Sequence, residues 1–135
     1  MKLLRIFAGL ALVIGLFTFT SSAAATAPCG GGTRVVVYEN ANYGGSWKYF
    51  CKPTNVPDLG NVGHSGYCYA QEIPYTGTWA DCISSYKAYG TGGYLCFFTG
   101  ASYTGFKQGY QVGAFVPQVQ WNDKILSIRW QTNPC

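Results

Sequence analysis

The sequence has few charged residues and almost no histidine. Of its 135 residues, 10% are charged, and His64 is the only histidine. A catalytic site would have to combine His64 and the adjacent Ser65 with an acid, for which the candidates are Asp58, Glu72, Asp81 and Asp123. No nucleophile elbow, zincin motif or metal-knuckle cysteine spacing accompanies them. We therefore expect a protein that is not an enzyme and that requires no cofactor.

A helical period of useful length is also missing after residue 28. Short runs rich in Val, Ile, Tyr, Phe and Trp alternate with Gly, Pro and Asn, which favours an all-β domain. Basic residues form no stripe: without Lys2 and Arg5 the nine become seven, scattered singly, against five acidic residues. This distribution argues against a nucleic-acid partner.

The first 25 residues are typical of a secretory signal peptide. Lys2 and Arg5 form a basic start, residues 6–19 an apolar run, and residues 23–25 a small-residue exit. A membrane anchor, the alternative, would need about 20 apolar residues with different flanks. We expect cleavage after Ala25 and a secreted, extracellular, monomeric domain of residues 26–135 that no longer contacts the membrane.

All six cysteines lie in residues 26–135. An even number in an exported chain predicts three disulfides, each of which stabilises the fold by about 2 to 4 kcal/mol. Six cysteines allow 15 pairings, and the sequence does not choose among them. The six are Cys29, Cys51, Cys68, Cys82, Cys96 and Cys135.

Two blocks occur twice in the same order. Residues 38–45 and 98–105 share an aromatic, a second aromatic five positions later, and a glycine two positions after that. Each block lies between β-rich runs and predicts a hairpin in which Gly45 and Gly105 adopt positive φ. Residues 79–85 and 121–127 share Trp-x-Asp-x-Ile-x-Ser. The chain therefore contains two copies of one unit, about residues 33–90 and 93–131, expected to pack as two sheets.

One apolar core should lie between the two sheets. Alternation in the first unit places Val35 and Val37 inward, and Leu95 and Phe97 are their counterparts in the second unit. Three isoleucines should close the core from the last strand of each unit, namely Ile83, Ile125 and Ile128.

The order of these motifs resembles the βγ-crystallin superfamily over about residues 33–131. The chain looks most like the small secreted bacterial types, including the streptomycete metalloproteinase-inhibitor-like proteins, in which a Tyr-Glu-Asn-x-Asn-Tyr-Gly-Gly hairpin is typical. The resemblance implies a two-sheet sandwich of two Greek-key motifs. It also implies structural roles in hairpin packing for Tyr38, Tyr43, Phe98 and Tyr103, and in tying down the folded hairpins for Ser85 and Ser127.

The resemblance further implies a calcium motif, Asx-Asx-x-x-Ser/Thr-Ser, whose ligands are shared between the two units. Each copy has lost one oxygen, because Ala80 begins the first copy and Leu126 replaces a hydroxyl in the second. If the two units share ligands in this way, one site combines Asp81 with Leu126 and should not bind calcium. The other site keeps its set, Asn122, Asp123 and Ser84. Either this one weak site binds calcium or neither does.

The first unit is longer than the second. Tyr38 to Ser85 spans 47 positions and Phe98 to Ser127 spans 29, a difference of 18. Equating Val56-Pro57 with Val116-Pro117 places the insertion at residues 58–78. Long structured loops on a rigid β frame often carry binding, although this one could instead cover a sheet edge and add a strand. Its candidate binding residues are His64, expected to be solvated, Tyr67, Tyr69 and Tyr75, with Cys68 pinning the loop.

Three functions follow from the sequence and the resemblance. The first is a secreted, non-enzymatic binding protein, specifically an inhibitor whose insertion occupies the cleft of an extracellular peptidase. The second is an extracellular calcium-binding or stress-stable structural protein. The third, implied by killer-toxin-like members of the superfamily, is an antimicrobial or wall-binding protein that uses exposed aromatics.

Overall fold

The computed structural model describes residues 28–70 and 73–135, and the expected signal peptide lies outside them. The described chain is all-β, and none of its helices is long and apolar enough to cross a membrane. The strands are β1 Arg34–Asn40, β2 Gly44–Cys51, β3 Gly63–Ala70, β4 Ile73–Thr78, β5 Ser85–Tyr89, β6 Tyr94–Phe98, β7 Lys107–Gln111, β8 Phe115–Val116 and β9 Ser127–Gln131. Short 3₁₀ turns are η1 Pro28–Gly31, η2 Ala41–Tyr43, η3 Leu59–Asn61 and η4 Ala101–Tyr103.

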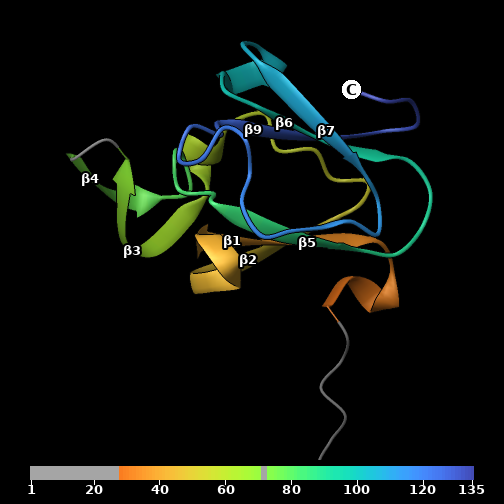
Figure 1. Ribbon diagram of the computed structural model, residues 1–135, viewed down its shortest axis with the longest axis horizontal. Coiled ribbons are helices and arrows are strands. Elements are labelled where there is room, and N and C mark those ends of the chain that lie inside the picture. Colours follow the sequence, from red (N-terminus) through yellow and green to blue (C-terminus); the bar gives the residue numbers. More distant parts are fainter. Residues whose placement is uncertain (1–27, 71–72) are drawn as a thin grey trace, which may run out of the picture.

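The strands form three antiparallel sheets. The first has the order β2-β1-β5-β8, the second β7-β6-β9, and the third contains only β3 and β4. The first two sheets face each other as the layers of a sandwich, and the β3–β4 hairpin stands apart at one end (Figure 1). The predicted all-β, two-sheet fold is confirmed, and we call the β3–β4 hairpin the ribbon.

The two units exchange their third strands. β8, from the second unit, pairs with β5 of the first. In return Val56 pairs with Ile128 of β9, through N–H···O bonds of 2.8 and 2.9 Å in the two directions. Val56 and Val116 thus hold corresponding places, as their alignment requires. Each sheet therefore mixes strands from both units, and neither unit forms a sheet on its own.

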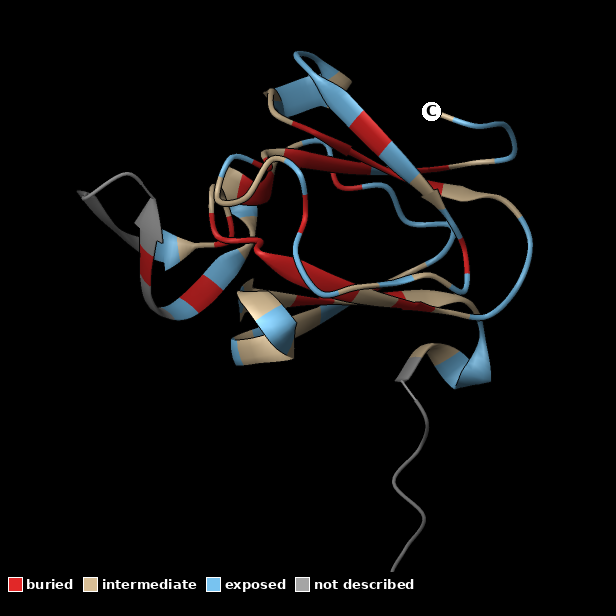
Figure 2. Cartoon of the chain, viewed as in Figure 1, coloured by how far each residue is buried: buried red, intermediate tan, exposed pale blue. Residues whose placement is uncertain are grey.

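The core lies between the two exchanged sheets. Val35 and Val37 of β1 and Leu95 and Phe97 of β6 are fully buried, as their alternation predicts. The three predicted isoleucines, Ile83, Ile125 and Ile128, are fully buried too. Ile128 lies on β9, whereas the other two lie in the turns that precede β5 and β9 rather than on the strands. Buried segments line the facing sides of both layers (Figure 2), and each such side chain contributes about 1.5 to 3 kcal/mol.

All six cysteines are paired, which confirms the three predicted disulfides. The pairs are Cys29–Cys51, Cys68–Cys82 and Cys96–Cys135, with Cα–Cα separations of 5.5, 5.2 and 5.8 Å. The first two disulfides lie before Thr91 and the third lies after Gly92, so none of them joins the two halves of the chain. The fold decides the pairing, because only tertiary packing brings these partners within bonding range.

The two hairpins are closed in the same way. Ser85 Oγ donates to Asn40 O at 2.6 Å and accepts from Tyr43 N at 3.0 Å. Ser127 Oγ repeats this with Gly100 O at 2.7 Å and Tyr103 N at 3.1 Å. Each hydroxyl therefore satisfies one donor and one acceptor of a folded-over hairpin.

The hairpin aromatics and glycines are also equivalent. Tyr38 and Tyr43 meet edge to face with centroids 5.6 Å apart, and Phe98 and Tyr103 do so at 5.8 Å. The following glycines, Gly45 and Gly105, have φ of 74° and 78°. The structure thus places these residues in matching structural positions of the two units.

Candidate functional site

A group of oxygen atoms meets where the two units join. Ser84 Oγ lies 2.7 Å from Asp123 Oδ1 and 2.5 Å from the carbonyl oxygen of Glu39. A hydroxyl has one hydrogen, so Ser84 donates to only one of these oxygens at a time, and the other contact is between lone pairs. A positive charge, either a proton or a bound cation, would relieve this contact between two oxygen atoms.

Asn122 contributes a further oxygen to this group. Its Nδ2 donates to Asp123 Oδ2, while its Oδ1 is buried and has no hydrogen-bond partner among the described residues. A buried acceptor without a partner costs about 1 to 3 kcal/mol. The structure therefore brings together all three members of the predicted shared set, Asn122, Asp123 and Ser84, and we call this set the oxygen cluster.

The electrostatics of the oxygen cluster disfavour negative charge. Burial raises the pKa of Asp123, and the charge of Glu39 raises it further, while hydrogen bonds from Ser84 and Asn122 oppose the rise. Burial also raises the pKa of Asp81, and the charge of Asp123 adds to this. A cation bound among these groups would remove the repulsion.

The corresponding place in the other half of the molecule lacks this chemistry. Asp81 and Asp123 are equivalent: their φ angles are 55° and 52°, and their N–H groups donate to Ile125 O and Ile83 O at 3.1 and 3.2 Å. Leu126 is the counterpart of Ser84 in the repeated motif, so Asp81 is matched with a leucine where Asp123 is matched with a serine. An isobutyl group cannot ligate a hard cation, so only one of the two places has a complete set of oxygens.

The donors in the oxygen cluster suit calcium better than a transition metal. They are a carboxylate, an amide oxygen, a hydroxyl and a backbone carbonyl, which are the ligand types of hard cations. Within residues 28–70 and 73–135, no three His, Cys, Asp or Glu side chains gather into a metal-binding group. With one ligating carboxylate, the residues fit a weak calcium site.

The insertion, residues 58–78, folds as the η3 turn followed by the ribbon. Asp58 Oδ1 accepts from Gly60 N at 2.8 Å and fixes the turn, and Leu59 is fully buried in the core. The ribbon then runs from the Gly63–Thr78 pair to the Ala70–Ile73 pair. Its strands pair only with each other, so the insertion projects from the sandwich instead of extending a sheet (Figure 1).

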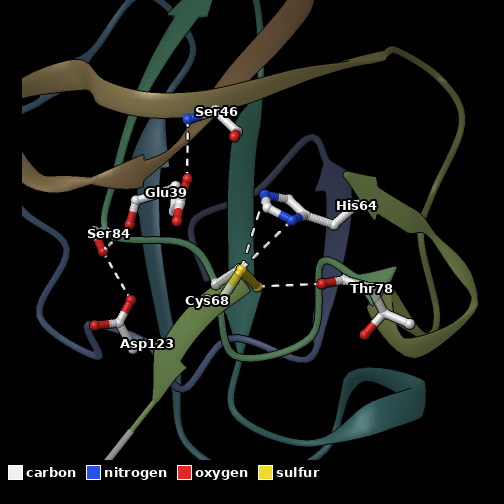
Figure 3. The surroundings of a disulfide bond; sticks show 8 residues. Glu39, Ser46, His64, Cys68, Thr78, Ser84 and Asp123 are labelled. Atoms are coloured by element: carbon white, nitrogen blue, oxygen red, sulfur yellow. Dashed lines mark hydrogen bonds between the residues drawn. A yellow bond between two sulfur atoms is a disulfide. The ribbon is translucent and has the colours of Figure 1, made fainter. Parts of the chain in front are cut away.

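Strand β3 of the ribbon is held near its beginning by His64 and towards its end by the Cys68–Cys82 disulfide. The His64 ring meets Trp79 edge to face at 4.6 Å, and its two nitrogens lie 3.8 and 3.9 Å from Cys68 Sγ. Figure 3 shows His64 on one side of this disulfide and Ser84 with Asp123 on the other. His64 is only 8% exposed, so the expectation that it is solvated is wrong.

Strand alternation could have indicated this position for His64. His64 and Cys68 are four positions apart on one strand, so a buried cysteine predicts a buried histidine on the same face. The side chains of Tyr67, Tyr69 and Tyr75 lie outside the described part of the structure, and their binding role stays a prediction. Their backbones lie on β3 and β4.

Sequence reasoning missed one further feature, a groove on the outer face of the β2-β1-β5-β8 sheet. The groove, of about 320 Å³, is lined by Arg34, Val36, Tyr38, Trp47, Tyr49 and Tyr89. Because Trp47 and Tyr49 alternate with Lys48 and the buried Phe50, they could have been placed on the opposite face.

Comparison with solved structures identifies the fold. The chain is similar to a βγ-crystallin from Ciona intestinalis, with a TM-score of 0.52 and 19% identity over 73% of this chain and 99% of that one. It is similar to an archaeal βγ-crystallin, with a TM-score of 0.52 and 22% identity over 74% and 99% of the two chains. A double mutant of a βγ-crystallin domain from Clostridium beijerinckii matches with a TM-score of 0.52 and 26% identity, over 74% and 98%.

The protein therefore has a βγ-crystallin fold: two Greek-key motifs in a two-sheet sandwich, stabilised by three disulfides. The matched region is almost the whole of each solved domain. No family profile matches the sequence, and no curated protein matches it.

Proposed function

We propose that the protein is a secreted, non-enzymatic binding protein that contacts a target protein through its ribbon, and that the target is an extracellular peptidase. The observation that carries this proposal is the ribbon itself, a separate two-stranded sheet that projects from the sandwich and whose strand β3 is covalently joined to Cys82. Three disulfides suit an oxidising, extracellular environment.

The two fixed positions on β3, His64 and Cys68, lower the entropy that the ribbon would lose on binding. The Cys68–Cys82 bond and the His64–Trp79 contact hold the strands in one orientation before any partner arrives. Pre-ordering of this kind increases affinity without adding contacts. A two-stranded sheet also has unpaired backbone groups along its outer edges, which can pair with an extended segment or cleft of a partner.

The position of His64 favours binding over catalysis. A general base must reach a nucleophile or a substrate, whereas the imidazole of His64 is buried between Trp79 and a disulfide sulfur. Its role there is to pack the base of the ribbon.

Shortening the ribbon tests the proposal. Residues 60–77 are replaced by a short turn and Cys82, whose partner is removed, is changed to Ser. Because the second unit connects the corresponding points without a ribbon, the sandwich should keep its β-sheet circular dichroism and cooperative melting. The shortened protein should lose inhibition in a panel of extracellular metallo- and serine peptidases that the full protein inhibits.

The matched control for this experiment is Phe106→Ala, an exposed change at the opposite hairpin. It should inhibit as well as the full protein. A folded, shortened variant that still inhibits at full strength would reject the ribbon as the contact element. A full protein that inhibits none of the panel would reject the peptidase as its target.

Calcium binding is a second candidate function, favoured by the oxygen cluster. The contact of Ser84 Oγ with both Asp123 Oδ1 and Glu39 O, together with the unpartnered Oδ1 of Asn122, is the arrangement that a bound cation would relieve. In this role Asp123 would supply the charge and the other oxygens would complete the shell.

A further inference from the structure

The groove on the outer sheet face is built from residues in register on three strands. Val35 and Val37 point into the core, so Arg34, Val36 and Tyr38 of β1 face outward. On one side, Trp47 lies opposite Tyr38 and Tyr49 opposite Val36. On the other, Tyr89 lies opposite Arg34 and Lys87 opposite Val36. The floor of the groove is thus continuous across β2, β1 and β5.

Several aromatic rings of this face are exposed to solvent instead of being packed against another part of the protein. Trp47 is 61% exposed, Tyr49 42% and Phe115, on the neighbouring β8, 53%. Isolated exposed apolar residues are common, but several gathered around one groove mark an interaction site. None of the residues that line the groove belongs to the ribbon or to the oxygen cluster.

The fold itself does not demand these rings, because the equivalent face of the other sheet lacks them. Trp47 pairs with Tyr38 as Lys107 pairs with Phe98, and Tyr49 pairs with Val36 as Gly109 pairs with Cys96. The second unit closes the same hairpin with a lysine and a glycine at these positions. The tryptophan and the tyrosine are therefore particular to the first sheet.

The charge of this face is positive. The guanidinium carbon of Arg34 lies 4.5 Å above the ring of Tyr89, and Lys87 Nζ lies 4.2 Å above the ring of Tyr43. No carboxylate lines the groove in the part of the chain that the structure describes. Both cations are held by aromatic rings rather than neutralised by acids, so each can still accept an anionic partner.

We propose that this groove binds an acidic glycan, a sugar chain that carries carboxylates. The flat C–H faces of a sugar ring bury apolar area against Trp47 and Tyr49 and make C–H contacts with the rings. A carboxylate on the same or the next sugar is then met by Arg34 with two parallel hydrogen bonds and by Lys87 as a point charge. A nucleic acid fits less well, because two cations make no track for a run of phosphates.

Binding of the mature, oxidised protein to oligogalacturonate, measured by calorimetry, tests this assignment. The fully methyl-esterified oligomer is the matched ligand, because it keeps the rings and loses the charges. Trp47→Ala should weaken binding of both ligands by about tenfold or more, the size expected from the loss of a stacked ring. Arg34→Gln should reduce the preference for the acidic form, because only Lys87 then meets the carboxylate, and added salt should weaken binding of the acidic form alone.

Phe106→Ala and Lys107→Gln are the controls, since both residues are exposed and lie outside the groove. They should leave both affinities unchanged. Equal affinity of the native protein for the two oligomers, or unchanged binding by Trp47→Ala, would overturn the proposal. So would binding to oligothymidylate or to phosphatidylglycerol vesicles without binding to oligogalacturonate. The ribbon-shortened protein should bind the glycan fully, which separates this proposal from the peptidase proposal.

Discussion

Asp123 is held in a left-handed backbone conformation and in an environment that opposes its charge. Its φ of 52° lies in the left-handed region, and burial followed by the charge of Glu39 raises its pKa above the ordinary 3.8. The folded state therefore holds the proton more tightly than the unfolded state does. The resulting stabilisation is fully present below the ordinary pKa and is lost as the pH rises through the raised value.

Asp123→Asn should consequently raise the melting temperature at neutral pH in the presence of a chelator. Asparagine has the same shape, tolerates positive φ and can still accept from Ser84, but it carries no charge. Thermal melts from about pH 3 to about pH 8 should show a flatter profile for this variant than for the native protein. An unchanged profile would show that Asp123 does not carry the effect.

With calcium present, the native protein should have a higher melting temperature than Asp123→Asn. We expect one site or fewer per chain by calorimetry, with a dissociation constant on the order of 10⁻⁴ to 10⁻³ M. Asp123→Asn should abolish binding, whereas the equivalent Asp81→Asn should not. Leu126→Ser should create a second site by restoring the missing hydroxyl. Two equal sites in the native protein would show that Leu126 is not a defect.

Gly105 combines a left-handed backbone with a crowded position. A Cβ there would meet Thr99 Oγ1 at 2.6 Å and Gly100 N at 3.1 Å, whereas one at Gly92, also at positive φ, would meet nothing within 4 Å. Gly105→Val should therefore destabilise the protein by more than about 1 kcal/mol in urea unfolding. Gly105→Ala should cost more than Gly92→Ala, because only the first adds crowding to the backbone strain.

At the scale of elements, the ribbon shows where sequence reasoning stops. Comparing the spacing of the two units located the insertion at residues 58–78, because the motifs on both sides of it are recognisable. Its hairpin was not predicted, since the run contains Gly66 and Pro74, which are unfavourable within strands. The pairing of Cys68 with Cys82 depends on how the ribbon folds back over Trp79, which no local pattern encodes.

The Cys68–Cys82 bond should stabilise the ribbon much more than it stabilises the sandwich. Changing both cysteines to Ser removes a 14-residue constraint, which is worth about 3 kcal/mol in the chain-entropy account. Leu59 and Trp79, at the two ends of the insertion, remain buried in the core. Hydrogen exchange should accelerate in β3 and β4 much more than in β6. Equal acceleration in all three strands would show that the bond stabilises the whole protein.

At the scale of the molecule, the repeated motifs predicted the fold class and the core, because hairpin glycines, hairpin serines and alternating apolar residues all recur. The exchange of third strands was not predicted. β8 has two residues and Val56 makes a single bridge, so neither has the length that a strand pattern needs. The aromatic groove was missed because alternation shows two faces of a strand but not which of them another layer covers.

The mature protein should have one N-terminus and no free thiol. Mass spectrometry should find a chain that begins near Thr26, with a mass about six units below that of the reduced chain, reflecting three disulfides. Alkylation without prior reduction should add nothing. Any alkylated cysteine would contradict complete pairing in solution.

No disulfide joins the chain before Thr91 to the chain after Gly92, while each sheet is completed by residues from the opposite unit. A single cut in the exposed segment at Thr91 and Gly92 would therefore leave two pieces with no covalent bond between them. Each piece lacks a strand that the other supplies, so they should stay together through gel filtration and separate only in denaturant. Mixed after dilution from denaturant, the oxidised halves should rebuild one sandwich, and neither should fold alone.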